Sequence, residues 1–199
     1  IPEGKERAAR TFNPQLGIEG GISILGTHGI VRPYSHEAFT ATIQEQLSIA
    51  KALNRKTVYF STGRRSERFL QARYPGEPDA AFIQTADFIG FALKEASARQ
   101  LSCVFGCFFG KLVKLAEGYP QTHAHIHPLA LDSVAALAGA CGVSEPNRLK
   151  TVLTAAHALE LLLLDPKGPA VLAALKERAL WQLHIARHKH TLFTRLLLF

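Results

Sequence analysis

The chain has 199 residues, of which 47% are hydrophobic and 20% charged, so it can bury a core and is not disordered throughout. Lys and Arg outnumber Asp and Glu by 23 to 16, and the net charge of +7 favours acidic partners, with a merely basic surface as the alternative. The basic residues are dispersed and no nucleic-acid-binding motif accompanies them, so we expect no nucleic acid partner. The 3 cysteines form no Cys-x-x-Cys pair, which argues against a disulfide framework and indicates a reducing cytoplasm. No apolar run approaches the ~20 residues of a membrane-spanning helix, so no membrane partner is expected.

Residues 1–20 are polar and rich in Gly and Pro, and they predict a linker that enters a single domain at residues 21–199. Because the sequence contains no Met, we expect the natural chain to begin upstream of Ile1. The apolar run at 21–25 predicts a first strand, with residues 22–25 inside the sheet. A loop at 26–34 follows, and Ser35 is predicted to cap a helix whose apolar stripe reaches Leu53.

Strands and helices then alternate along the chain. Strands are predicted at 57–60, 81–84 and 103–105, and the helices between them at 65–74, after a capping Asp87, and at 111–117. This alternation predicts a Rossmann-like three-layer α/β/α fold with a mainly parallel sheet. Extra helices toward the carboxy terminus are predicted at 131–140, 147–164 and 169–187, and a last strand at 194–199 returns to the sheet.

Ligands of an open parallel sheet bind beyond the carboxyl ends of its strands. Four loops are predicted there, at residues 26–31, 61–64, 85–87 and 106–111. Glycines let the backbone approach a ligand closely, and helix starts offer free N–H groups to an anion. The run Gly26-Thr27-His28-Gly29 matches neither the dinucleotide-binding nor the triphosphate-binding glycine motif. It is therefore either a ligand loop of another kind or a turn that needs small residues.

Three ordered segments resemble one known family. Residues 13–33, Asn-Pro-Gln-Leu-Gly-Ile-Glu-Gly-Gly-Ile-Ser-Ile-Leu-Gly-Thr-His-Gly-Ile-Val-Arg-Pro, closely resemble the signature segment of the cobalt-precorrin-5B C(1)-methyltransferases, in which the position of His28 is commonly Thr. Residues 87–93, Asp-Phe-Ile-Gly-Phe-Ala-Leu, and residues 110–118, Gly-Lys-Leu-Val-Lys-Leu-Ala-Glu-Gly, followed by Thr-His at 122–123, match family segments in the same order. The resemblance covers about residues 1–135, in the carboxy-terminal portion of the family, whose amino-terminal domain is absent from this chain.

The resemblance implies S-adenosylmethionine-dependent methyl transfer to C-1 of cobalt-precorrin-5B, which gives cobalt-precorrin-6A in cobalamin (vitamin B12) biosynthesis. The alternative is a non-catalytic Rossmann-like module that binds a tetrapyrrole or a nucleotide. Methyl transfer requires in-line placement more than a strong acid or base, which agrees with the lack of a catalytic triad or carboxylate pair. A homo-oligomer is compatible with this reading.

The candidate cofactor-binding residues are those at the predicted strand ends. We expect S-adenosylmethionine to be bound there by Gly26, Thr27, His28, Gly29, Thr62, Gly63, Asp87 and Gly106. Asp87 would hold a ribose hydroxyl, or it would serve only as a helix cap.

Basic residues near the same loops are candidates for the acetate and propionate arms that the implied tetrapyrrole substrate carries. Arg64 could grip a carboxylate with its forked guanidinium, and a surface role is the alternative. Lys111 and Lys114 lie one helical turn apart and could clamp a carboxylate together, with a solvated face as the alternative.

Three histidines alternate at 123, 125 and 127. His123 and His125 are the catalytic candidates, for contact with the substrate or proton handling, and an ordinary polar loop is the alternative. No Cys or carboxylate lies near them in the sequence, so no protein-bound metal is predicted.

Overall fold

The computed structural model describes residues 2–11, 13, 18–22, 35–119, 121–122, 129–186 and 194–198. The predicted strand from residue 23 onward and the loop at 26–34 lie outside these ranges, while Gly21 and Ile22 are described and form no strand.

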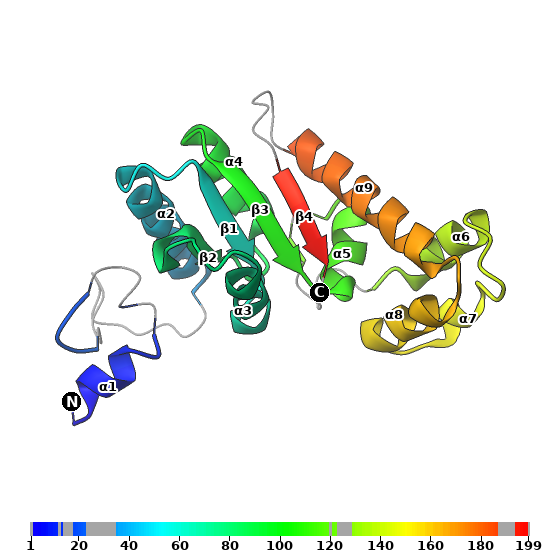
Figure 1. Ribbon diagram of the computed structural model, residues 1–199, viewed down its shortest axis with the longest axis horizontal. Helices are drawn as coiled ribbons and strands as arrows, with labels where there is room; N and C mark the ends of the chain where they lie inside the picture. The colour runs from blue at the N-terminus through cyan, green and yellow to red at the C-terminus, as the bar shows by residue number, and fades with distance from the viewer. Residues whose placement is uncertain are drawn as a thin grey trace.

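The described residues contain one parallel sheet with the strand order β2-β1-β3-β4 (Figure 1). Its strands agree with the predicted ones and include the returning strand at the carboxy terminus; they are β1 (Thr57–Ser61), β2 (Phe82–Gln84), β3 (Ser102–Cys107) and β4 (Thr194–Leu198). The predicted α/β fold with a mainly parallel sheet is therefore confirmed. One boundary was wrong: Gly106 is not in a loop but inside β3, because it pairs with Ser61 of β1 on one side and with Leu197 of β4 on the other.

The helix after residue 35 begins as predicted, because the Ser35 side chain accepts a hydrogen bond from the Ala38 N–H at 3.3 Å. A short helix also occurs near the start of the chain. The helical elements are α1 (Gly4–Ala8), α2 (His36–Ala52), α3 (Arg64–Arg73), the 3-10 turn η2 (Asp79–Ala81), α4 (Ile89–Ala98), α5 (Phe109–Ala116), α6 (Leu131–Ala140), α7 (Arg148–Thr151), α8 (Ala155–Leu164) and α9 (Gly168–Ala186).

Two helix predictions need correction. Asp87 does not cap α4, which has Phe88 at its N-cap and no side-chain cap; the Asp87 carboxylate bonds to Lys111 and Thr122 instead. The helix predicted at 147–164 is broken after α7, because Val152 and Thr154 are extended. The Thr154 side chain accepts a hydrogen bond from the His157 N–H at 3.2 Å and so starts α8 as a new helix.

The sheet is covered on both faces. Strand residues that include Phe60 and Phe105 point into the larger core, where α2, α4 and α9 pack. The alternate residues, including Tyr59 and Phe82, pack with Leu70 of α3 on the other face. Full burial of each phenylalanine side chain contributes roughly 1.5–3 kcal/mol, so this alternation fixes which strand residues face each layer. Among the described helices, none combines the length and apolar character needed to cross a bilayer.

Candidate functional site

The order in which the chain adds strands to the sheet reverses after β2. It passes from β1 to β2 on one side, then returns past β1 to β3 on the other. The carboxyl ends of β1 and β3 point to the same edge in Figure 1. Helix α3, which follows β1, packs on one face, whereas the apolar side chains of α5, which follows β3, belong to the core on the other face. Such a divergence is where open α/β sheets bind ligands.

The turn between β1 and α3 lies at this position and contains two predicted cofactor-binding residues. Ser66 fixes the turn: its hydroxyl accepts from the Thr62 N–H at 3.0 Å and donates to the Gly63 carbonyl at 2.9 Å. The Thr62 hydroxyl lies 3.1 Å from the same Ser66 oxygen. Gly63 has extended backbone, and a Cβ there would meet no atom of the described residues within 4 Å. Among the described residues, nothing therefore blocks the approach of a ligand to the backbone at Gly63.

A second group of polar side chains gathers where β2 and β3 lead into their helices. Lys111 donates to the Asp87 carboxylate and, at 3.2 Å, to the Thr122 carbonyl. Lys114 donates to the same carbonyl at 3.0 Å. The Thr122 hydroxyl donates to Asp87 at 2.9 Å. We call these four residues the Asp87 network. It ties the end of one predicted ligand loop to helix α5.

The Asp87 network is mostly withdrawn from solvent. Lys114 is 7% exposed and Thr122 is 2% exposed. Burial lowers the pKa of Lys114 below its ordinary value, the neighbouring Lys111 lowers it further, and Asp87 acts in the opposite direction. The ammonium groups of both lysines thus have partners within the protein, and Thr122 is held directly before residue 123.

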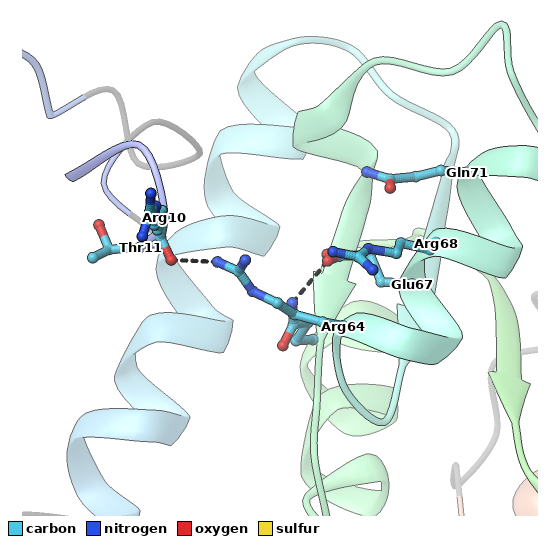
Figure 2. Close-up of a pocket in the computed structure, with 7 residues that line it drawn as sticks. Arg10, Thr11, Arg64, Glu67, Arg68 and Gln71 are labelled. Atoms are coloured by element: carbon cyan, nitrogen blue, oxygen red, sulfur yellow. Dashed lines mark hydrogen bonds between the residues drawn. The ribbon is translucent and has the colours of Figure 1, made fainter. Parts of the chain in front are cut away.

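A third group forms a pocket of about 360 Å³ between the start of the chain and α3. Figure 2 shows Arg64 extending from α3 toward Arg10, with Arg68 beside it. The Arg64 guanidinium donates to the Arg10 carbonyl, which joins the two walls. We call this the arginine pocket. Its lining residues are Arg10, Thr11, Arg64, Glu67, Arg68, Gln71 and Gln84.

The structure brings together some of the predicted site residues and leaves others apart. Asp87, Lys111 and Lys114 meet in one network, whereas Arg64 lies in the arginine pocket. Gly106 is buried within β3. Gly26, Thr27, His28, Gly29, His123 and His125 lie outside the described residues.

Sequence reasoning missed Thr122 as a partner of the lysines, and Arg10 and Arg68 as neighbours of Arg64. Arg68 could have been found, because it lies four residues after Arg64 on the same helix face. Arg10 gave no local signal, since it lies in the polar segment before the domain.

The fold and the site define a class of protein: an α/β domain whose parallel sheet has the kind of edge at which such folds bind ligands, with basic residues beside it. Comparison with known proteins narrows this class. Residues 1–33 match the model of the family described as CbiD. The cobalt-precorrin-5B C(1)-methyltransferase of Nitratidesulfovibrio vulgaris is 49% identical over 183 residues, which cover 90% of this chain and 47% of that protein.

Two other relatives with the same name give shorter matches. The protein of Moorella thermoacetica is 44% identical over 145 residues, covering 72% of this chain and 40% of the relative. The protein of Priestia megaterium is 42% identical over 145 residues, with the same coverage of 72% and 40%. The chain thus spans less than half the length of these relatives. No solved structure shows a significant match.

These matches confirm the resemblance noted in the motifs: the chain is related by sequence to the cobalt-precorrin-5B C(1)-methyltransferases. The relationship extends farther than residues 1–135, since the longest of these matches includes 183 residues.

Proposed function

We propose that this chain is part of an S-adenosylmethionine-dependent methyltransferase that methylates C-1 of cobalt-precorrin-5B and so produces cobalt-precorrin-6A in cobalamin biosynthesis. The observation that carries the proposal is the 49% identity with the N. vulgaris enzyme over 90% of the chain. The open edge of a parallel sheet is a suitable site for a cofactor of this kind.

In this proposal, S-adenosylmethionine lies over the carboxyl ends of β1 and β3. Thr62 and Gly63 contact it, because the backbone at Gly63 is open. The cofactor contacts proposed outside the described residues are Gly26, Thr27, His28 and Gly29. Gly106 is buried in β3, so we propose an indirect role for it: because it has no side chain, it leaves space at the end of that strand. The Asp87 carboxylate already accepts hydrogen bonds from Lys111 and Thr122. To bind the cofactor, it would have to accept a further hydrogen bond from a ribose hydroxyl.

The substrate residues are proposed with different roles. Arg64 is exposed and faces a pocket, which suits direct contact with a carboxylate. Lys111 and Lys114 donate to Asp87 and Thr122, so a substrate carboxylate would compete with these bonds. We therefore propose that the two lysines act mainly by holding Thr122. His123 and His125, which follow it in the chain, remain the proposed residues for substrate contact or proton handling.

Methyl transfer requires that the reacting atoms be aligned. The methyl group leaves the sulfonium sulfur and bonds to a ring carbon in one displacement, so the protein must hold sulfur, methyl and carbon in line. Residues that bind the two partners therefore contribute to the rate even if they exchange no proton.

The proposal is tested by incubating the intact protein with cobalt-precorrin-5B and S-adenosylmethionine carrying a ¹³C methyl group. We expect one labelled methyl group on C-1 of the product by NMR, and no transfer would contradict the function. The cofactor site is tested by Gly63→Leu, which should weaken the binding of S-adenosylhomocysteine in calorimetry by at least about tenfold, or 1.4 kcal/mol. Gly76→Leu is the matched control, since a Cβ at Gly76 also meets no described atom within 4 Å, and Gly76 lies in the turn after α3.

A further inference from the structure

We propose that the arginine pocket binds carboxylate arms of the tetrapyrrole substrate, through Arg10, Arg64 and Arg68. The inference rests on the proposed function, and it assigns a carboxylate subsite to the pocket and substrate-binding roles to Arg10 and Arg68.

The first argument is that none of the ion pairs formed among the described residues includes these three guanidinium groups. Within the part of the chain that the structure describes, Arg10, Arg64 and Arg68 take part in no ion pair with a carboxylate. Arginines elsewhere do so, as Arg55 with Glu77 and Arg99 with Glu95. Like charges at i and i+4 of a helix destabilise it, so Arg64 and Arg68 on one face of α3 would be relieved by an anion between them.

The second argument concerns the walls of the pocket. All seven lining residues are polar. Glu67 is only 7% exposed and accepts from the Gln84 amide at 2.8 Å, so its carboxylate is turned toward the sheet. With three arginines and one glutamate, the lining carries a formal charge of +2. Thr11 and Gln71 add neutral donors. This lining suits an anion that accepts hydrogen bonds, and it includes no apolar residue against which an adenine ring would pack.

The third argument is the position of the pocket at the ligand-bearing edge of the sheet. Gln84 is the last residue of β2 and Arg64 is the first residue of α3. The Arg64 guanidinium holds the Arg10 carbonyl, which fixes the segment after α1 against α3. A ligand over the end of β1 would therefore have the arginine pocket beside it, where an arm projecting from a ring would enter.

A carboxylate could also come from the amino-acid end of S-adenosylmethionine, and the experiment separates the two sources. We would measure by calorimetry the affinity of the intact protein for uroporphyrin, whose ring carries acetate and propionate groups, and for S-adenosylhomocysteine. A porphyrin carrying cationic N-methylpyridyl groups controls for binding of the ring alone.

The variant to test is Arg10→Gln with Arg68→Gln. The matched control, Lys51→Gln with Arg73→Gln, removes the same charge from exposed positions outside the pocket. We expect the pocket variant to bind uroporphyrin at least about tenfold more weakly than the control variant at low salt, with a smaller difference at high salt. Its affinity for S-adenosylhomocysteine should be unchanged.

A second variant, Gln71→Glu, adds a negative charge to the pocket and breaks no hydrogen bond seen among the described residues. It should weaken uroporphyrin binding in a protein that is otherwise intact, even if the double arginine variant fails to fold. Uroporphyrin affinity equal to that of the control in both pocket variants would overturn the inference. So would loss of S-adenosylhomocysteine binding, alone or to the same degree as that of uroporphyrin. These outcomes are distinct from failure of the proposed function, which would appear as absence of methyl transfer by the unsubstituted protein.

Discussion

The arginine pocket and the Asp87 network are both basic and both lie where strands lead into helices, yet their charges are used differently. In the Asp87 network, two lysines and a threonine converge on one carboxylate and one carbonyl, and two members are almost fully buried. In the arginine pocket, the three arginines are exposed, and among the described residues a backbone carbonyl accepts a hydrogen bond from one of them. Charge of one sign thus stabilises the fold in the first region and remains available to a ligand in the second.

This difference shows that a net charge of +7 does not by itself identify which lysine or arginine side chains can bind a partner. A buried ion pair is costly to break, because the remaining charge stays desolvated. An exposed arginine contributes little to folding, so its loss affects mainly the ligand. The two regions should therefore respond in opposite ways to substitution.

The largest effect is expected from Asp87→Ala. This change leaves Lys111 and the buried Lys114 without the carboxylate that offsets their charge, and it removes the acceptor of the Thr122 hydroxyl. The free energy of unfolding in urea should fall by about 2–4 kcal/mol. Asp79→Ala, at an exposed position in η2, should change it by less than about 0.5 kcal/mol. Equal effects of the two substitutions would show that the Asp87 network does not stabilise the fold.

A smaller loss is expected from Thr122→Val, which keeps the shape of the side chain and removes its hydroxyl. The substitution deletes the 2.9 Å bond to Asp87 at a residue that is 2% exposed. We expect the free energy of unfolding to decrease by about 1–2 kcal/mol. Thr122→Ser should retain most of the stability, since it keeps the donor; a Ser variant as unstable as the Val variant would assign the loss to packing.

The pH dependence of stability should distinguish Lys114 from the pocket arginines. Burial lowers the pKa of Lys114 in the folded protein below the ordinary 10.5. Between the lowered value and 10.5 the unfolded chain binds more protons than the folded one, so the free energy of unfolding should rise with pH in that window. Lys114→Met should remove this rise, as measured by urea unfolding at about pH 8 and about pH 10. Arg68→Gln should leave the rise unchanged, because arginine stays protonated throughout. The same rise in the Lys114 variant would contradict the assignment.

The smallest effect on stability is expected from Arg10→Gln with Arg68→Gln. Since neither guanidinium pairs with a carboxylate in the described residues, the free energy of unfolding should change by less than about 0.5 kcal/mol. A loss as large as that of Asp87→Ala in urea unfolding would show that the pocket is structural and would remove the contrast between the two regions.

Most of the fold could be predicted because its signals are local. Ser35 caps its helix from three residues away, and the apolar strands at 57–61 and 102–107 are separated by helical patterns. The wrong strand boundary arose where pairing across the sheet decided the outcome. Gly106 is typical of a loop by composition, yet β1 and β4 extend the ladder past it on both sides.

The site was less predictable, since its partners are distant in the sequence. Asp87 and Lys111 are 24 residues apart and Arg10 and Arg64 are 54 apart. A sequence shows that each is charged, but only the fold decides which of them meet. Asp87 therefore looked like a helix cap, and Arg10 like part of a linker.

The contrast between the two regions is tested most directly by NMR of their side-chain nitrogens during a titration of the intact protein with uroporphyrin. The account predicts that the guanidinium Nε–H signals of Arg10, Arg64 and Arg68 shift and saturate together, while the ammonium signals of Lys111 and Lys114 stay in place. Shifts confined to the two lysines, with the arginine signals unmoved, would contradict it.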